Sequence, residues 1–172
     1  KKYPEWDAVA RAPQRSIASA IKSSGISEPK SRYIKESLAT LLEGHGDLKL
    51  KFLEKMEDRE ALEYLTLLPG VGVKTASCVL MFSLGRPVMP VDTHVFRVCK
   101  KLDFVPEDAT RVAAHQILNA IVPPDDRYSL HISPVKHCHK ICTANSTPFD
   151  ERVVDGPVPG DALPTYLYFR PF

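Results

Sequence analysis

Lys74 is the residue in this sequence whose position most favours chemistry. It follows the turn Pro69-Gly70-Val71-Gly72 and would lie in the first turn of an apolar helix. The helix dipole disfavours a cation at that end, so a lysine there is a candidate nucleophile. The alternative is that Lys74 is an ordinary exposed surface charge, which is the commoner role of any single lysine.

The turn in front of Lys74 is itself a candidate binding site. Two apolar helices joined by Pro69-Gly70-Val71-Gly72 would form a tight hairpin, in which glycines permit positive φ and close approach of another backbone. Backbone amides at the start of the second helix lack acceptors within the helix and can bind phosphate without reading base sequence. The alternative is a turn that only joins packed helices. The pattern predicts contacts with a polynucleotide backbone from Gly70, Val71, Gly72, Val73 and Thr75.

A carboxylate follows Lys74 in the segment Val91-Asp92-Thr93-His94. Asp92 stands where a helix carrying Val95, Val98 and Leu102 would begin, so it is expected to be an N-cap. Capping is compatible with catalysis, and Asp92 is the second candidate catalytic residue.

These two segments together resemble a known family. Leu68-Pro-Gly-Val-Gly-Val-Lys-Thr-Ala76, followed by Pro90-Val-Asp-Thr-His-Val-Phe-Arg97, is similar to the endonuclease III branch of the helix-hairpin-helix (HhH-GPD) DNA glycosylases, and the similarity runs from about Pro4 to Cys142. The resemblance implies that Lys74 attacks the sugar C1′ of a damaged nucleotide flipped out of duplex DNA. It implies that Asp92 activates this lysine or stabilises positive charge on the sugar.

A lysine nucleophile implies more than base removal. Its amine would leave a Schiff base, which acidifies the C2′ protons and permits β-elimination of the 3′ phosphate. The resemblance therefore implies a base-excision-repair DNA glycosylase with AP-lyase activity, acting on double-stranded DNA that contains a damaged base or an abasic site. An oxidised pyrimidine is the family-wide expectation, and methylated cytosine or mismatched thymine stay open. The alternatives are a non-catalytic helix-hairpin-helix DNA-binding module and a structural helical domain that recruits partners through its tail.

The sequence departs from the family pattern in three places. Nothing before Tyr3 matches the upstream core helix that family members usually carry, so we expect a trimmed chain or a lineage without that segment. Many relatives bind a 4Fe–4S cluster through four cysteines, and only Cys142 matches a cluster ligand, so we predict no cluster and no other cofactor. His137, Cys138, His139 and Cys142 are too close in sequence to converge on one tetrahedral zinc ion, so we predict no metal.

Helical periodicity supplies the elements that would position the candidate residues. Turn and capping residues delimit about seven helices, near residues 13–25, 27–44, 58–68, 73–84, 92–102, 108–122 and 127–142. Ser27 and Asp58 are expected N-caps, Pro134 is expected to kink or shorten the last helix, and Cys78 and Cys99 are expected to be buried thiols. We predict an all-α, multi-helix HhH-GPD glycosylase fold over residues 1–142. The five prolines after Thr143 predict an extended or disordered tail over residues 143–172.

Composition narrows the class of protein without identifying it. The 172 residues contain no apolar run near the roughly 18 residues of a membrane span, and the four cysteines are too few and too scattered for a disulfide scaffold. The net charge of +2 is compatible with nucleic acid but is not evidence for it. We expect a monomer that does not bind membranes, located in the nucleus if the source is eukaryotic and otherwise in the cytoplasm.

Overall fold

The computed structural model describes residues 2–140, with side chains through Val135, and this range is helical and contains no β-strand. The chain divides into two compact units, Lys1–Ala76 and Ser77–Phe172. The first unit contains α1 (Trp6–Arg11), α2 (Gln14–Ala20), η1 (Lys22–Ser24), α3 (Ser27–His45), η2 (Leu50–Lys55), α4 (Asp58–Leu67) and the start of α5 (Val73–Cys78). The second contains the end of α5, the π-helical turn η3 (Val79–Ser83), α6 (Thr93–Lys101), α7 (Arg111–Ile121), η4 (Pro124–Asp126) and α8 (Arg127–Lys140).

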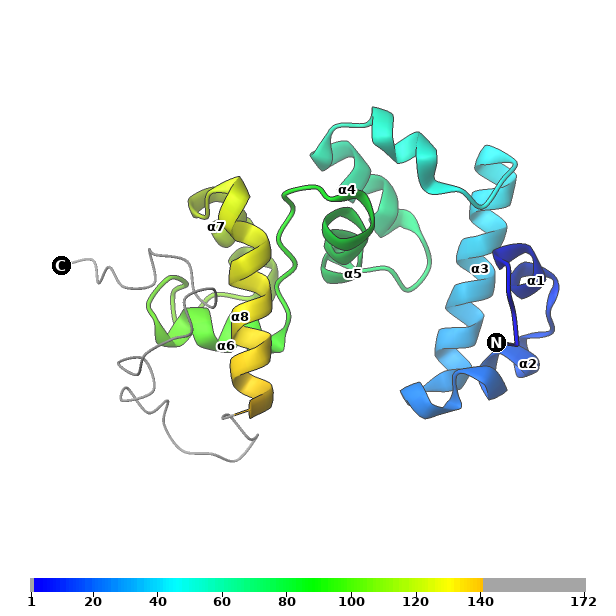
Figure 1. Cartoon of the computed structure of the whole chain (residues 1–172), viewed down its shortest axis with the longest axis horizontal. Coiled ribbons are helices and arrows are strands. Elements are labelled where there is room, and N and C mark those ends of the chain that lie inside the picture. Colours follow the sequence, from blue (N-terminus) through cyan, green and yellow to red (C-terminus); the bar gives the residue numbers. More distant parts are fainter. Residues whose placement is uncertain (1, 141–172) are drawn as a thin grey trace. The chain divides into compact units, whose positions relative to one another are not determined.

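In the first unit, the short helices α1 and α2 pack along the longer α3 (Figure 1). Apolar residues on α2 and α3, among them Ile17 and Leu38, are buried. The Lys35 ammonium of α3 donates to the carbonyls of Ala10 and Ala12 at 3.0 and 2.7 Å, which satisfies backbone acceptors at the end of α1. These contacts fix the amino-terminal helices on α3.

A polar aromatic cluster joins the end of α3 to η2 and α4. The rings of His45 and Phe52 stack with centroids 3.6 Å apart, and His45 Nε2 lies 2.7 Å from Tyr64 Oη. Between α3 and η2 the chain turns at Gly46, whose φ of 73° is the left-handed conformation common after a helix. The cluster therefore holds α4, the first helix of the hairpin, against the element that precedes it.

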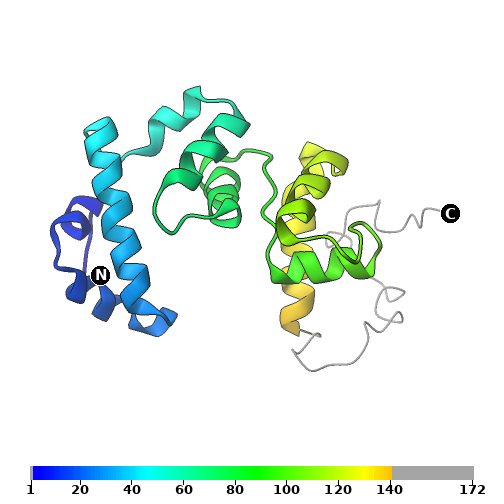
Figure 2. The same cartoon turned by 180° about the vertical axis from the view of Figure 1, so that it is seen from behind.

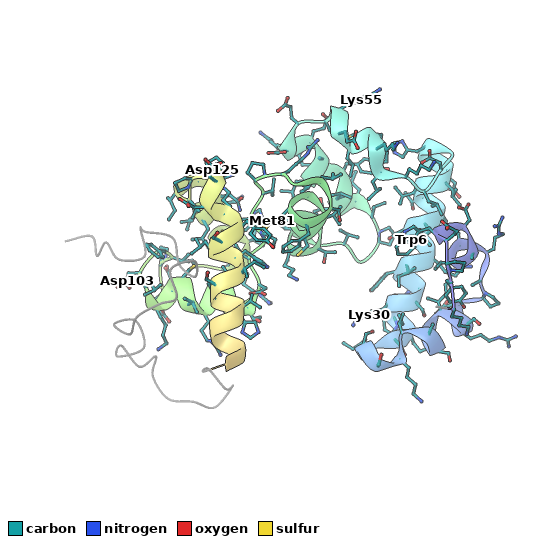
Figure 3. The ribbon with its side chains drawn as sticks, viewed as in Figure 1. Trp6, Lys30, Lys55, Met81, Asp103 and Asp125 are labelled. Carbon is teal, nitrogen blue, oxygen red and sulfur yellow. The ribbon has the colours of Figure 1, made fainter. Side chains whose placement is uncertain are left out.

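In the second unit, α8 packs against α6 (Figure 2). The chain reverses after α6 through Asp103, whose φ is 57° (labelled in Figure 3). Met81 of η3, also labelled there, belongs to one continuous apolar core. The other buried members of that core are Met89, Val91, Val95, Cys99, Val105, Ala114, Leu118, Val122 and Leu130.

The predicted all-α class is confirmed, and a helix occurs in each of the seven predicted regions. The sequence pattern did not predict α1. Two predicted caps are wrong. Ser27 is the first residue of α3, because Gly25 and Ile26 turn the chain with positive φ before it. Asp58 is likewise the first residue of α4, with Glu57 at the cap position. Pro134, which was expected to kink or shorten the last helix, lies inside α8, and the helix continues beyond it to Lys140.

Some predictions fall on other parts of the chain. The boundary at residue 142 and the tail over residues 143–172 lie outside the described residues. Within residues 2–140, every helix is too short or too polar to cross a bilayer.

Candidate functional site

The hairpin turn between α4 and α5 is closed by the chain itself. The amide of Val71 donates to the carbonyl of Leu68 at 3.0 Å, and Ser37 Oγ of α3 donates to the carbonyl of Pro69 at 3.1 Å. The turn is therefore held both internally and by a side chain from a neighbouring helix, which gives the residues after it a defined position.

The two glycines of the turn play different roles. Gly70 has φ +74°, and a Cβ built on it would stand 2.5 Å from the ring of Tyr33, so both conformation and packing require glycine there. Gly72 has no positive φ, and a Cβ on it would meet nothing within 4 Å. The expectation of positive φ is thus confirmed for Gly70, where the close neighbour is the side chain of Tyr33 and not another backbone. Nothing in the described chain requires a glycine at position 72, so the turn alone does not explain that residue.

Lys74 lies on the exposed surface in the first turn of α5, next to the exposed Thr75. The helix hydrogen-bond series begins with the amide of Ala76 donating to the carbonyl of Gly72 at 3.0 Å. By helix geometry, the amides of Gly72, Lys74 and Thr75 therefore have no acceptor within α5. Val73 already makes an interaction within the chain. The exposed start of α5 thus combines an amine with amides suited to an anion.

Asp92 begins α6 as the predicted N-cap. Its Oδ1 accepts hydrogen bonds from the amides of His94 and Val95, both at 2.9 Å. The cap uses one carboxylate oxygen and does not need Oδ2. Asp92 is half-buried, so capping leaves a carboxylate oxygen for another role.

The connecting segment, residues 84–91, leads from η3 to Asp92 and is held by polar side chains. Asn119 of α7 pairs with both backbone groups of Met89: Oδ1 accepts from the amide at 2.8 Å, and Nδ2 donates to the carbonyl at 3.0 Å. His131 Nδ1 lies 2.8 Å from the carbonyl of Pro90, and Arg127 donates to the carbonyl of Pro87. The segment before the candidate carboxylate is therefore anchored at three carbonyls.

A buried polar pair lies in the same unit. Ser77 Oγ and His115 Nε2 are 2.8 Å apart, and both side chains are buried. Burial lowers the pKa of His115, because it disfavours the charged imidazolium. Cys99 is fully buried, which confirms the expectation of a buried thiol there, and this burial raises the pKa of the thiol to about 12. Cys78 is only partly buried.

Two of the basic residues of α6, Arg97 and Lys100, interact with other groups of the chain. Lys100 donates to the carbonyl of Glu107 and lies over the ring of Phe96, 4.8 Å from its centroid. Arg97 also makes an interaction within the chain, whereas the neighbouring Lys101 is exposed. Cations in the last turn of a helix stabilise its negative end, so Lys100 and Lys101 have a structural explanation without DNA.

Among the described residues, no group of three or more His, Cys, Asp or Glu side chains could hold a metal ion. The side chains of His137, Cys138, His139 and Cys142 fall outside this range. The predicted absence of a metal and of a 4Fe–4S cluster therefore stays a prediction.

The predicted site residues thus fall into two groups. The hairpin residues Gly70 to Thr75 belong to the first unit, and Asp92 belongs to the second. The sequence pattern did not predict the roles of Asn119, Arg127 and His131, which hydrogen-bond to the connecting segment. Nor did it predict that the ring of Tyr33 lies against Gly70. The one signal for Asn119 is a polar amide within the apolar run Ile117-Leu118-Asn119-Ala120-Ile121.

The sequence of this chain is similar to those of known proteins. Residues 1–124 match the model of the HhH-GPD superfamily base excision DNA repair protein family. A protein of Arabidopsis thaliana described as a candidate DNA glycosylase is 38% identical over 141 residues, which cover 82% of this chain and 48% of that protein. Endonuclease III of Escherichia coli is 35% identical over 128 residues, covering 74% of this chain and 56% of the enzyme.

A solved structure of an endonuclease III–DNA complex is also similar to this chain. The trapped covalent intermediate of endonuclease III with DNA matches with a TM-score of 0.68 and 29% sequence identity, over 84% of this chain and 64% of that chain. This chain spans about half the length of the curated relatives that it matches.

Proposed function

Because the chain belongs to the HhH-GPD superfamily of base excision DNA repair proteins, we propose that it is a DNA glycosylase with AP-lyase activity. It would remove a damaged base from duplex DNA and then cleave the strand at the resulting abasic site. The observation that carries the proposal is the exposed Lys74 in the first turn of α5, directly after the closed hairpin turn. A related structure is a trapped covalent intermediate of endonuclease III with DNA, which supports a covalent mechanism.

Binding would begin at the start of α5. The amides of Gly72, Lys74 and Thr75 suit a phosphate oxygen, because they are aligned with the positive end of the helix dipole. The open space beside Gly72 allows a DNA backbone to approach the peptide closely. This contact would position the protein on DNA without specifying a base.

The chemical step uses the amine of Lys74. Its nitrogen lone pair bonds to C1′ of the flipped nucleotide, and the glycosidic electron pair leaves with the base, which takes up a proton. Opening of the sugar ring gives a protonated Schiff base. Loss of a C2′ proton then expels the 3′ phosphate by cleavage of the C3′–O bond, and water hydrolyses the Schiff base to restore Lys74. Neither the base removal nor the elimination requires a metal or a redox cofactor.

Asp92 would act electrostatically in this sequence. Departure of the base places positive charge on the sugar, and a fixed carboxylate stabilises such charge. The Oδ2 atom that the cap of α6 does not need is suited to this role or to accepting a proton from Lys74. The substrate we propose, from the family resemblance alone, is an oxidised pyrimidine. A damaged base of any kind costs less free energy to unstack than a normal one.

A borohydride trapping experiment tests the proposal. The protein is incubated with a duplex containing one abasic site, borohydride is added, and the covalent adduct is measured on a denaturing gel. We expect an adduct with the wild-type protein and none with Lys74→Gln, because borohydride fixes the protein to the DNA only where an amine of the protein has formed a Schiff base with the sugar. Lys51→Gln removes the same charge from another exposed site of the first unit and serves as the matched control.

Each alternative result has a definite meaning. An adduct that survives Lys74→Gln would contradict the role of Lys74 as the nucleophile. Binding to the duplex without an adduct in the wild-type protein would favour the non-catalytic DNA-binding module instead. In that case Lys74→Gln should change the affinity and its salt dependence by one phosphate contact or less.

A further inference from the structure

We propose that Asn119 and His131 are positioning residues that hold Asp92 in the orientation required at the sugar. The inference rests on the proposed function, because it concerns how the carboxylate of that site is fixed. Both residues lie outside the two motifs that reveal the family. Among the described contacts, neither is hydrogen-bonded to Asp92, so they would act through the backbone of the connecting segment.

The connecting segment has the hydrogen-bonding needs of a buried strand without having a sheet partner. Residues 88–91 are all buried, and buried peptide groups require hydrogen-bond partners. The amide group of Asn119 supplies them at Met89, since it accepts from the N–H and donates to the C=O of the same residue. The second hydrogen of Nδ2 goes to the carbonyl of His115 at 2.9 Å, which fixes the Asn119 amide to its own helix.

His131 provides the last anchor before Asp92. The carbonyl of Pro90 can only accept, so Nδ1 of His131 must carry the proton in this hydrogen bond. The imidazole is buried, and its ring lies edge-on to Phe82 with centroids 5.5 Å apart. The orientation of the ring, and with it the position of Pro90, is therefore set by packing as well as by the hydrogen bond.

Asp92 is thus fixed from both sides. On its carboxyl-terminal side, Oδ1 is tied to the amides of His94 and Val95. On its amino-terminal side, the backbone is tied at Met89 and Pro90 to α7 and α8. Release of the second tie would let the start of α6 shift. A shift of about 1 Å in a catalytic group costs up to about 100-fold in rate.

Two polar variants of His131 test whether the hydrogen bond to Pro90 matters, because one keeps a donor at the position of Nδ1 and the other does not. The side-chain nitrogen of Asn is attached to Cγ, as Nδ1 of histidine is, so His131→Asn keeps a donor toward Pro90. His131→Gln places its nitrogen one bond further out, at the position of Nε2, and loses that donor. We expect His131→Gln to lower the single-turnover rate of base excision on the order of 10- to 100-fold and His131→Asn to restore most of it. Val105→Ala, a cavity in the same core, is the control for lost stability.

The same variants in an Asp92→Asn background decide whether His131 acts through Asp92. If it does, His131→Gln should change the residual rate less than about twofold in that background, since interacting residues are not additive. If His131→Gln lowered the rate by the same factor with Asp92 and with Asn at position 92, the proposal would be overturned. It would also be overturned if His131→Gln left the rate unchanged in the protein that retains Asp92. The corresponding test of the second anchor is Asn119→Asp, which keeps the acceptor for the Met89 amide and loses the donor to its carbonyl.

Amide hydrogen exchange needs no substrate, so it tests the positioning role even if the proposed function is wrong. If the wild-type protein forms no borohydride adduct, the proposed function fails and the anchors are judged by amide hydrogen exchange at His94 and Val95. Faster exchange of these two amides in His131→Gln but not in His131→Asn would support the positioning role. Unchanged exchange in His131→Gln would overturn it, whatever the protein does to DNA.

Discussion

The hairpin and the connecting segment present their candidate catalytic groups in opposite ways. Lys74 lies exposed on the first turn of α5, where the chain leaves the surface beside Gly72 open. Asp92 is half-buried, and the backbone before it is held by side chains from two other helices. The first group is set by the shape of a short local turn, whereas the second depends on residues far away in the sequence.

This difference has a physical origin. An amine that must form a bond with an external sugar has to be accessible, and a turn of four residues is sufficient to present it. A carboxylate that stabilises charge must stay in place while the charge develops, so it gains from a rigid surrounding. We therefore expect a variant at the hairpin to affect only the turn itself and its contact with DNA. We expect a variant of Asp92 to lower the rate of base excision without lowering the free energy of unfolding.

The largest expected effect comes from Asp92→Asn. Asparagine caps a helix about as well as aspartate does, so the free energy of unfolding should change by less than about 0.5 kcal/mol. The variant carries no negative charge, and we expect the single-turnover rate of base excision to fall at least about 100-fold, the order found when a single electrostatic group is removed. Chemical denaturation and single-turnover kinetics on the same preparation measure both quantities.

Affinity for duplex DNA distinguishes this interpretation from a general binding defect. It should not weaken in Asp92→Asn, since removal of a negative charge does not disfavour a polyanion. A loss of stability in proportion to the loss of rate would show that Asp92 serves the cap alone.

The next effect compares two glycines in one turn. Gly70→Ala forces a Cβ to within 2.5 Å of Tyr33 at a φ of +74°, so we expect a loss of stability of about 1–3 kcal/mol. Gly72→Ala meets nothing within 4 Å and should leave stability within about 0.5 kcal/mol. If a DNA backbone approaches Gly72, the same methyl group should weaken binding several-fold. Thermal unfolding and DNA titration of both variants test the contrast.

Two results would contradict the different roles of Gly70 and Gly72. A Gly72→Ala variant that binds DNA with unchanged affinity would remove the argument that the open space at position 72 admits the ligand. Loss of stability in both variants would mean that both glycines serve only the fold of the turn.

The same contrast explains what the sequence could predict. The hairpin and the cap at Asp92 depend on residues within a few positions of one another, so glycine spacing and capping preference were sufficient to find them. The anchors were not predictable, because Asn119 and His131 meet the connecting segment only after α7 and α8 have packed. The distinction between Gly70 and Gly72 was equally hidden, since it depends on Tyr33 in α3.

The errors at helix starts have a local cause. Ser27 and Asp58 are good capping residues, yet each lies one position inside its helix. For α3, the preceding Gly25 and Ile26 adopt positive φ and bring the helix start forward by one residue. Capping preference identified the right region but not the exact residue, because the approach of the chain decides which residue is the cap.

The smallest expected effect concerns pH and the buried pair of the second unit. Burial lowers the pKa of His115, so the unfolded state, with a histidine pKa of about 6.5, binds a proton more readily than the folded state. The stabilisation from neutral His115 is present above pH 6.5 and is lost as pH falls through that value toward the lower folded pKa. The wild-type protein should therefore lose stability on acidification by up to about 1.4 kcal/mol per pH unit more than His115→Gln, which has no such proton. Urea unfolding of both proteins at pH 7.5 and 5.5 measures the difference.

Amide hydrogen exchange can show whether the stability lost at low pH is lost near Asp92 or at the hairpin. We expect protonation of His115 to disturb its contact with Ser77 and its own helix α7, which also carries Asn119. Amide exchange at His94 and Val95 should therefore accelerate at low pH in the wild-type protein more than in His115→Gln, once the intrinsic pH dependence is removed. The amide of Val71, which closes the hairpin turn, should respond equally in both proteins. An equal response at all three amides would mean that the site at Asp92 is no more dependent on the buried polar network than the hairpin is.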